Sequence, residues 1–440
     1  MEIVGIIGLL CAIAVMVIGA YKGLGPLPLT IIAAAIAILT NGLNVWEAYS
    51  SFYMAGYAGT YTSYFLIFIF SALYARFMEE SGSAVAIGFK LIDWFGKKHV
   101  MLISVIIFSV LTYGGISLFV VIFAAGPIMF MLFKEANLPR HLGMVVMGMG
   151  TCTYTMTSLP GTPALTNIIP TQYLGTTMTA APVLSIIISI TLFVLCYIYA
   201  VHAYKKAYAG GEGWTYPEAG NYSQYDIKNR ELLPAAWKAF LPIIVLIGMI
   251  IIGGRFTDKS AMLTVLAMMV ASIICYLLNY NKFRDIKKTV LLTSGLGGGI
   301  NAIGGLAAVV AFGTVVQNTD AFQRIVDWLL NLNMNPYVEG VFSTAVISGV
   351  AGSSSGGLRI TLQTLGEHFI ASGCNLQVLH RLMSVAAGSL DTLPHSAGLF
   401  MVLQWMGLTH KTGYRHLFWT SVFIPTIVVI VATVVCVFIY

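Results

Sequence analysis

Asp391 and His395 are ionisable residues in the middle of an apolar stretch, 382–406, that is long enough to cross a membrane. Removal from water favours the neutral form of a carboxylic acid, and imidazole titrates near neutral pH, so both are candidate proton carriers. Four residues separate them, which would place both on one face of a continuous helix. We expect Asp391 to carry a proton and His395 to be its hydrogen-bonding partner or a substrate ligand. The reverse assignment and a structural role for His395 remain open.

Arg359, in the segment "GGLRITL", is a basic residue within another apolar stretch. A cation inside a membrane is costly unless it lines water, pairs with an acid or receives an anion. Its planar guanidinium can hold a carboxylate through two parallel hydrogen bonds. A single cation at such a site favours a monocarboxylate over a di- or tricarboxylate. In the alternative interpretation, Arg359 extends to the outer surface or pairs with Asp391.

Clusters of glycine, serine and proline interrupt four apolar segments, and such residues end helices. The interruptions are "YGGIS" (113–117), "SLPGTPALTN" (158–167), "AGSSSGG" (351–357) and "SLDTLPHSAG" (389–398). A helix that restarts after such a break points backbone N–H groups and the positive end of its dipole into the membrane, which suits an anion. We expect Thr162 to cap a helix that begins at Pro163, and Thr392 and Pro394 to repeat this arrangement. The alternative is that the breaks only kink helices for packing.

The residues in and beside these breaks form the predicted site. Serine and threonine hydroxyls there can bind a hydroxyl or keto oxygen of the substrate, or they can simply satisfy the backbone of the break. The candidate substrate ligands are Gly114, Gly115, Ser158, Thr162, Thr166, Asn167, Ser353, Ser354, Ser355, Gly356, Gly357, Arg359, Thr392, His395 and Ser396.

The composition of the chain indicates an integral membrane protein. Of its 440 residues, 58% are hydrophobic and only 9% are charged, too few to cover a soluble globule. The net charge of +6 comes from short basic clusters beside apolar runs, which fits a lipid bilayer as partner and not nucleic acid. The six cysteines have no CxxC spacing, so we expect no disulfide, no metal site and no cofactor. Residues 2–20 lack a basic n-region and a cleavage site, and we expect them to be a retained first span.

Ten runs are long enough to cross the membrane, including the two broken spans 141–174 and 376–408. Two further apolar segments, 100–133 and 338–371, are interrupted at their midpoints and are either kinked crossings or re-entrant hairpins. With two hairpins and an outside N-terminus, most basic residues, including the loop 205–230, face the cytoplasm. Full crossings would move that loop outside, against the positive-inside rule, so we predict hairpins. The basic residues then expected on the outer side are Arg255, Lys259, Arg324 and Arg381.

The order of these segments recurs. Each half has three spans, a hairpin, a broken span and a last span, and five crossings per half make the second half inverted relative to the first. Paired broken helices in inverted repeats are the architecture of secondary transporters, whose site lies at the midplane. The predicted fold is therefore an all-α polytopic membrane protein with two inverted repeats of five transmembrane helices. Its parts are 1–204 (hairpin 100–133, broken helix 141–174), a cytoplasmic linker at 205–232, and 233–440 (hairpin 338–371, broken helix 376–408).

Several motifs resemble the gluconate permease (GntP) family of the ion transporter superfamily, and the similarity in order and spacing covers most of the chain. They are "FGKKH" (95–99), "SLPGTPALTNIIP" (158–170) and "LPHSAG" (393–398). The resemblance implies proton-coupled uptake of small organic acids across a bacterial inner membrane, and analogy with superfamily relatives suggests a homodimer. The stretch "GSLDTLPHSAG" is more similar to members linked with short-chain hydroxy acids and keto acids than to the gluconate carriers.

We therefore expect a secondary active transporter that imports a small organic monocarboxylate, such as 3-hydroxybutyrate, by proton symport. The alternatives are a gluconate or other sugar-acid symporter and a sodium-coupled carboxylate transporter. An enzyme is not expected, because an intramembrane hydrolase needs a nucleophile with a base, paired aspartates or a metal cluster. A channel is less well supported, because a filter built by subunit symmetry needs no inverted repeat within one chain.

Overall fold

The structure is a computed structural model that describes residues 2–218, 225–226, 230–253, 256, 260–330 and 334–440. Throughout these residues the regular secondary structure is helical, and no strand is present. Eight of the described helices are long and apolar enough to cross a membrane. The prediction of an all-α polytopic membrane protein is confirmed.

The helices follow the predicted order closely. The first half contains α1 (Glu2–Tyr21), α2 (Pro26–Thr40), α3 (Val45–Glu47), α4 (Met54–Glu80), α5 (Ser83–Phe95), α6 (Val100–Tyr113), α7 (Leu118–Glu135), α8 (Gly143–Thr151), α9 (Tyr154–Thr157), α10 (Leu165–Leu174) and α11 (Pro182–Ala209). The second half contains α12 (Ala236–Gly253), α13 (Ser260–Leu278), α14 (Tyr280–Phe283), α15 (Lys288–Gln317), α16 (Asp320–Leu330), α17 (Pro336–Ala351), α18 (Ser354–Ala371), α19 (Leu376–Ala387), α20 (Ala397–Met406), α21 (Arg415–Leu417) and α22 (Ile424–Ile439).

The two interrupted segments are pairs of short helices that pack against each other, α6 with α7 and α17 with α18. Local chemistry sets where the second pair begins. The side chain of Asn335 accepts a hydrogen bond from the N–H of Tyr337, and Pro336 occupies the first turn of α17, where its missing N–H costs nothing. At the next helix start, Asn375 caps α19 by accepting from the N–H groups of Gln377 and Val378.

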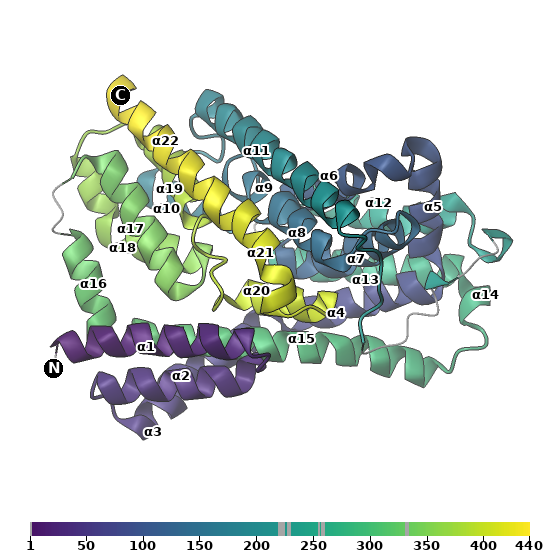
Figure 1. Ribbon diagram of the computed structural model, residues 1–440, viewed down its shortest axis with the longest axis horizontal. Coiled ribbons are helices and arrows are strands. Elements are labelled where there is room, and N and C mark those ends of the chain that lie inside the picture. Colours follow the sequence, from purple (N-terminus) through teal and green to yellow (C-terminus); the bar gives the residue numbers. More distant parts are fainter. Residues whose placement is uncertain (1, 219–224, 227–229, 254–255, 257–259, 331–333) are drawn as a thin grey trace.

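Two long helices, α4 and α15, run antiparallel through the protein (Figure 1). Glycines of α15 let their backbones approach closely. A Cβ at Gly299 would lie 2.7 Å from the carbonyl oxygen of Phe68, and one at Gly295 would lie 2.9 Å from Leu73. The contact at Gly299 is with backbone, so this crossing requires glycine there, whereas the atom nearest to Gly295 is the flexible Cδ1 of Leu73.

The remaining contacts pair off between the halves. Helix α1 packs on α2 as α12 packs on α13, and α2 packs on α15 as α13 packs on α4. The last spans, α11 and α22, also pack against each other and cross the molecule side by side (Figure 1). This exchange of partners is what a two-fold relation between the halves would produce. The inverted orientation of the halves and the sidedness of the hairpins stay predictions.

Two amphipathic helices, α5 and α16, occupy matching places after the long helices and were not expected from the sequence. Charged residues alternate with apolar ones along α16, as in Asp320, Arg324 and Asp327. Helix α5 meets the segment Lys97–Tyr113 at an angle of 106°. Each of these helices therefore links a long span to the hairpin that follows it.

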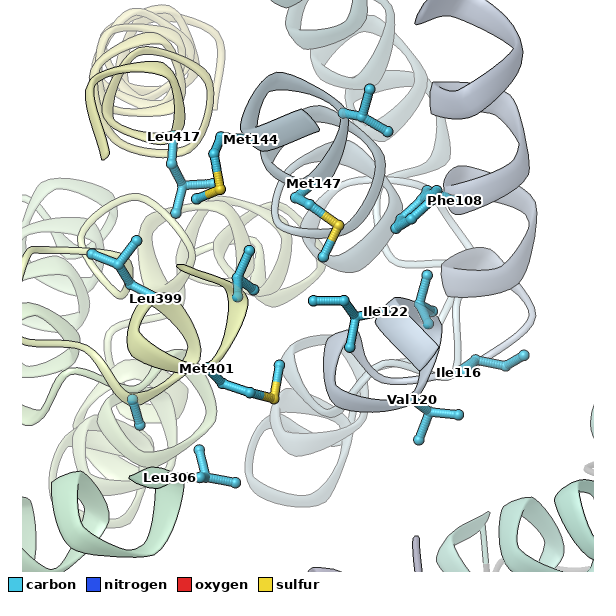
Figure 2. Close-up of a cluster of buried hydrophobic side chains, with 14 of the residues drawn as sticks. Phe108, Ile116, Val120, Ile122, Met144, Met147, Leu306, Leu399, Met401 and Leu417 are labelled. Atoms are coloured by element: carbon cyan, nitrogen blue, oxygen red, sulfur yellow. The ribbon is translucent and has the colours of Figure 1, made fainter. Parts of the chain in front are cut away.

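A core of buried apolar side chains joins elements of both halves (Figure 2). Ile122 of α7 and Met147 of α8 lie in this cluster with Met401 of α20 and Leu417 of α21, and all four are almost fully buried. The hairpin and the broken helix of the first half are thus packed directly on the broken helix and the last span of the second half.

The described part of the predicted linker lies against the ends of α4, α5 and α7. Tyr225 donates a hydrogen bond to Glu79 of α4, and Arg230 pairs with Asp93 of α5. Helix α11 continues to Ala209, past the predicted boundary at 204. Three basic residues that entered the charge argument, Lys228, Arg255 and Lys259, lie outside the described residues.

Candidate functional site

Each hairpin tip rests on the break of its own half. A Cβ at Gly115, in the first tip, would lie 2.7 Å from Cγ of Pro163 in the first break. A Cβ at Gly352, in the second tip, would lie 3.4 Å from both Cδ2 of His395 and Cα of Ser396 in the second break. Both glycines have positive φ, +94° and +60°, which other residues rarely adopt. Both tips therefore favour glycine for their turn, and the close contact with the break adds to this requirement only at Gly115.

Four helices begin at these tips and breaks: α7, α10, α18 and α20. Ser353 caps α18, because its side chain accepts from the N–H of Gly356 at 3.2 Å. The residues that precede the other three helices, Ser117, Ala164 and Ser396, make no such side-chain cap. Helix N-termini carry unpaired N–H groups and partial positive charge, so this arrangement suits an anion.

The predicted capping arrangement is wrong in both halves. Helix α10 begins at Leu165, not at Pro163, and the Thr162 hydroxyl is buried without a hydrogen-bond partner in the described structure. Helix α20 begins at Ala397, not at Pro394. Thr392 instead shares a hydrogen bond with the hydroxyl of Ser421, 2.7 Å away. In each half the helix restarts after the proline, at Leu165 two residues beyond Pro163 and at Ala397 three residues beyond Pro394.

Arg381 of α19 is fully buried and joins the two broken helices. Its Nη1 donates to the carbonyl oxygen of Thr157 at 2.8 Å, and its Nη2 donates to the amide oxygen of Asn167 at 3.0 Å. The expectation that Arg381 faces the outer solution is therefore wrong. Burial is tolerated because these acceptors replace water around the guanidinium.

His380 and Ser384 strengthen the same junction. The His380 ring lies 3.0 Å from the amide oxygen of Asn167 and 2.7 Å from the hydroxyl of Thr176. Ser384 donates to the carbonyl oxygen of Thr166. His380, which is not among the predicted site residues, is fully buried at this contact. We call the contacts of His380, Arg381 and Ser384 with the first broken helix the α19 clamp.

Several predicted ligands have their polar atoms engaged by the protein. The amide nitrogen of Asn167 donates to the carbonyl oxygens of Thr162 and Met178, while its oxygen accepts from the α19 clamp. Thr166 donates to the carbonyl oxygen of Met156. The hydroxyl of Ser158 lies 2.8 Å from that of Ser189. These contacts favour the alternative in which such residues satisfy the backbone of the break.

Gly357 belongs with the structural group as well, because a Cβ there would lie 2.4 Å from Cα of Ser348 in α17. It allows the two helices of the second hairpin to approach. In the first tip, Gly114 ends α6 and is partly exposed.

The second tip and the second break hold polar atoms without partners. Asp391 is partly exposed, its Oδ1 makes no hydrogen bond within the described chain, and its polar neighbours include Ser354. His395 is buried, with Nε2 3.0 Å from the carbonyl oxygen of Gly349 and Nδ1 unpaired among the described residues. The hydroxyl of Ser396 is likewise buried without a described partner. Unpaired buried polar groups are costly, which makes these atoms candidates for binding a substrate or a proton.

Arg359 stands one turn of helix beyond Ser355 and is exposed. Gln363 and Glu367 follow it at intervals of four residues and are exposed too, so α18 presents a polar face along most of its length. No ion pair between Arg359 and Asp391 occurs in the structure as described, which excludes the pairing considered from the sequence. A polar face of this kind requires water or a partner and not lipid tails.

Comparison with known proteins identifies the family. The sequence profile described as GntP family permease matches residues 2–440. The chain belongs to the GntP family of permeases. It is also similar to the uncharacterized transporter YxjC of Bacillus subtilis (strain 168), with 29% identity over 451 residues that cover 93% of this chain and 94% of that protein. The family predicted from the motifs is confirmed, and with it a permease function in a multi-pass membrane protein.

Among the described residues of this GntP family permease, no three histidine, cysteine, aspartate or glutamate side chains lie close enough together to hold a metal ion. Its six cysteines are all free thiols.

The α19 clamp is the part of the site that sequence analysis missed. Arg381 lies five residues inside the predicted broken helix 376–408, and His380 adjoins it. An intramembrane arginine was a sufficient signal for a functional or structural site. The charge argument instead places Arg381 with the basic residues expected on the outer side.

Proposed function

We propose that this permease imports a small organic monocarboxylate together with a proton across a bacterial inner membrane. The observation that carries the proposal is the meeting of hairpin tip and break in each half, which brings the starts of α7, α10, α18 and α20 to the two tips. The N–H groups at the starts of α7, α10 and α20, which have no side-chain cap, offer fixed donors for a carboxylate without adding a net positive charge to the protein.

Arg359 is the proposed cationic ligand. It lies on α18 one turn from Ser355 and has no ion-pair partner in the described chain, so a substrate carboxylate would not have to displace an acid. The polar face formed by Arg359, Gln363 and Glu367 is the proposed water-filled path to the tip. One cation neutralises one carboxylate, which favours a monocarboxylate such as 3-hydroxybutyrate.

Asp391 is the proposed proton carrier. Its unpaired Oδ1 can hold a proton, and the adjacent backbone of the break is not fixed by a helix. His395 is the proposed partner, because its Nδ1 is also unpaired, and it serves either Asp391 or the substrate hydroxyl. A proton and a carboxylate that bind together enter the membrane with less net charge than either alone. Ser354, Ser355, Thr162 and Ser396 are the proposed hydroxyl ligands.

Gluconate is the second candidate substrate, and the description of the family supports it. A sugar acid carries several hydroxyls, and the second tip with its break supplies several serines. Sodium is the alternative coupling ion, with carbonyl and hydroxyl oxygens of the breaks as its ligands. A homodimer is proposed by analogy with the superfamily alone.

Ligand-induced thermal stabilisation of the purified permease tests the substrate. A ligand at 100 times its dissociation constant should raise the free energy of unfolding by about 2.7 kcal/mol. We expect 3-hydroxybutyrate to stabilise more than gluconate, and a dicarboxylate such as succinate to have no effect. Stabilisation by gluconate alone would replace the short-chain acid by the sugar acid as substrate.

Uptake into proteoliposomes tests the coupling. An inward proton gradient should drive accumulation of the stabilising acid, whereas a sodium gradient at equal pH on both sides should not. Exchange of labelled for unlabelled substrate without a gradient distinguishes a carrier from a channel. Accumulation that follows sodium alone would remove Asp391 from the proposed mechanism.

A further inference from the structure

A cavity of about 580 Å³ lies between the last spans of the two halves, away from the tips and breaks. Its walls come from α11 and from the continuous helix His410–Ile439, which pack side by side (Figure 1). None of the proposed transport residues lines it. The cavity therefore needs an explanation of its own.

One end of this cavity is cationic. Lys206 in the last turn of α11, Arg415 at the start of α21 and His202 line it, and all three are exposed. Neither Lys206 nor Arg415 has an ion-pair partner within the described residues. Two unpaired cations beside one cavity favour an anion there.

The one acidic residue at that end does not oppose the cations. Glu212 is held by His141, with 2.5 Å between its Oε2 and the Nε2 of the ring. The other ring nitrogen of His141 lies 2.8 Å from His416, which in turn lies 2.9 Å from the hydroxyl of Tyr199. The carboxylate of Glu212 is thus engaged by the ring of His141. Lys206 and Arg415 remain available to bind an anion.

The rest of the cavity is apolar. Leu195 and Ile198 of α11 face Phe423, Ile424 and Ile427 of the other helix across it. Beyond the cavity both helices continue with exposed apolar side chains, as at Ile190 of α11 and Ile430 and Val434 of α22. A small soluble anion would leave these apolar walls without an apolar partner, whereas the acyl chain of a lipid would be buried against them.

The depth of the cavity matches one leaflet. From Lys206 back to Leu195, and from Arg415 on to Ile427, each helix rises by roughly 17 Å at about 1.5 Å per residue. Half of a bilayer with its headgroup region is roughly 20 Å. A single phospholipid in the leaflet on the basic side would therefore place its phosphate at the cations and its chains along the apolar walls.

We propose that this cavity binds an anionic phospholipid, with Lys206 and Arg415 holding the headgroup phosphate. Basic pockets between transmembrane helices on the cytoplasmic side are suited to such headgroups. The lipid would join α11 to α22 and hence the last spans of the two halves. It would fill a gap that the two helices leave open and would stabilise the permease without taking part in substrate binding.

Native mass spectrometry of the purified permease with added phosphatidylglycerol or phosphatidylcholine tests this site. Each adjacent cation contributes a factor of about five in affinity, so Lys206→Gln with Arg415→Gln should weaken retention of phosphatidylglycerol about 30-fold. The matched control is Lys205→Gln with Lys411→Gln, which removes two exposed basic residues beside the first pair but outside the cavity. The control should change retention less than threefold.

A second variant keeps the charges and removes the space. Ile198→Trp should fill the apolar end and weaken phosphatidylglycerol binding while the melting temperature without lipid stays unchanged. If the Lys206 and Arg415 double variant and the Lys205 and Lys411 control lose phosphatidylglycerol to the same extent, the lipid is held by general attraction to a basic surface. That result would overturn the site. Equal retention of phosphatidylcholine by the unmodified permease, or displacement of the lipid by soluble glycerol phosphate at the same concentration, would also overturn it.

Discussion

The guanidinium of Arg381 lies 3.0 Å from the amide oxygen of Asn167, and this hydrogen bond connects the broken helix of one half to that of the other. The same arginine also reaches the carbonyl oxygen of Thr157. Both acceptors belong to the first half, and Arg381 belongs to the second. The two broken helices can therefore move relative to each other at this contact only if its hydrogen bonds break.

Arg381→Met should destabilise the permease. The substitution keeps length and removes the donors, leaving the oxygens of Thr157 and Asn167 without one of their partners, at a cost of about 1–3 kcal/mol for each. The melting temperature in detergent measures the loss. Arg359→Met, which removes an exposed arginine, is the matched control and should change the free energy of unfolding by less than about 0.5 kcal/mol.

A double-mutant cycle gives a second readout. If Arg381 and Asn167 act through one contact, Arg381→Met and Asn167→Ala together should cost less than the sum of the two single losses, by about 0.5–3 kcal/mol. Strict additivity would contradict the α19 clamp.

Arg359→Lys should weaken substrate binding without affecting stability. Lysine keeps the charge but loses the paired donors that fit a carboxylate, so we expect the dissociation constant to rise at least tenfold. Titration of the stabilising acid by isothermal calorimetry measures it. Arg284→Lys, the same substitution at an exposed arginine between α14 and α15, serves as the control. Unchanged affinity in Arg359→Ala would leave Arg359 as an interfacial side chain.

Asp391→Asn should separate exchange from accumulation. The amide resembles the protonated acid and cannot release a proton, so uphill uptake driven by a proton gradient should be lost while substrate exchange continues. Proteoliposome uptake with and without the gradient measures both. Glu47→Gln, which changes an exposed acid on α3 outside the proposed path, should behave as the unmodified protein. Full accumulation by Asp391→Asn would move the proton to His395 or elsewhere.

Gly115→Ala should impair transport through the contact of the first tip with Pro163. A methyl group there would meet the proline ring at 2.7 Å, and φ of +94° adds backbone strain. Gly175→Ala is the matched control, because Gly175 has φ of +64° but nothing within 4 Å of an added Cβ. Backbone strain alone predicts similar effects for both variants, whereas the tip contact predicts a much larger loss of transport for Gly115→Ala.

Thiol labelling tests the predicted sidedness. Cys374, partly exposed between α18 and α19, should react with a membrane-impermeant reagent from outside, as should a cysteine placed at Glu367. Ala136→Cys, beside Lys134 and near Arg140, should react only from the cytoplasm. Cys11 is also exposed and has to be replaced first. Labelling from the opposite sides would mean that the positive-inside argument had inverted the topology.

The sequence by itself determined the class of the protein and the places where its apolar segments are interrupted. These features depend on local chemistry. A run of apolar residues is stable only in lipid or a core, and glycine, serine and proline end a helix wherever they cluster. The hairpin predicted at 338–371 accordingly corresponds to α17 and α18, and the broken helix predicted at 376–408 corresponds to α19 and α20. The GntP family followed from three motifs, two of which, 158–170 and 393–398, lie in these breaks.

Only the tertiary structure decided which polar side chains are occupied and which are free. Arg381 can be buried because the carbonyl oxygen of Thr157 accepts a hydrogen bond from it. Thr157 lies 224 residues away in the chain, so no local sequence pattern contains this pairing. Asn167 and Thr166 are engaged by neighbours, whereas Asp391 and His395 each keep an unpaired atom. An arginine or aspartate within an apolar segment looks the same in the sequence whether its polar atoms are hydrogen-bonded by the protein or left unpaired. The difference lies in contacts between segments distant in the chain, which exist only once the two halves have packed together.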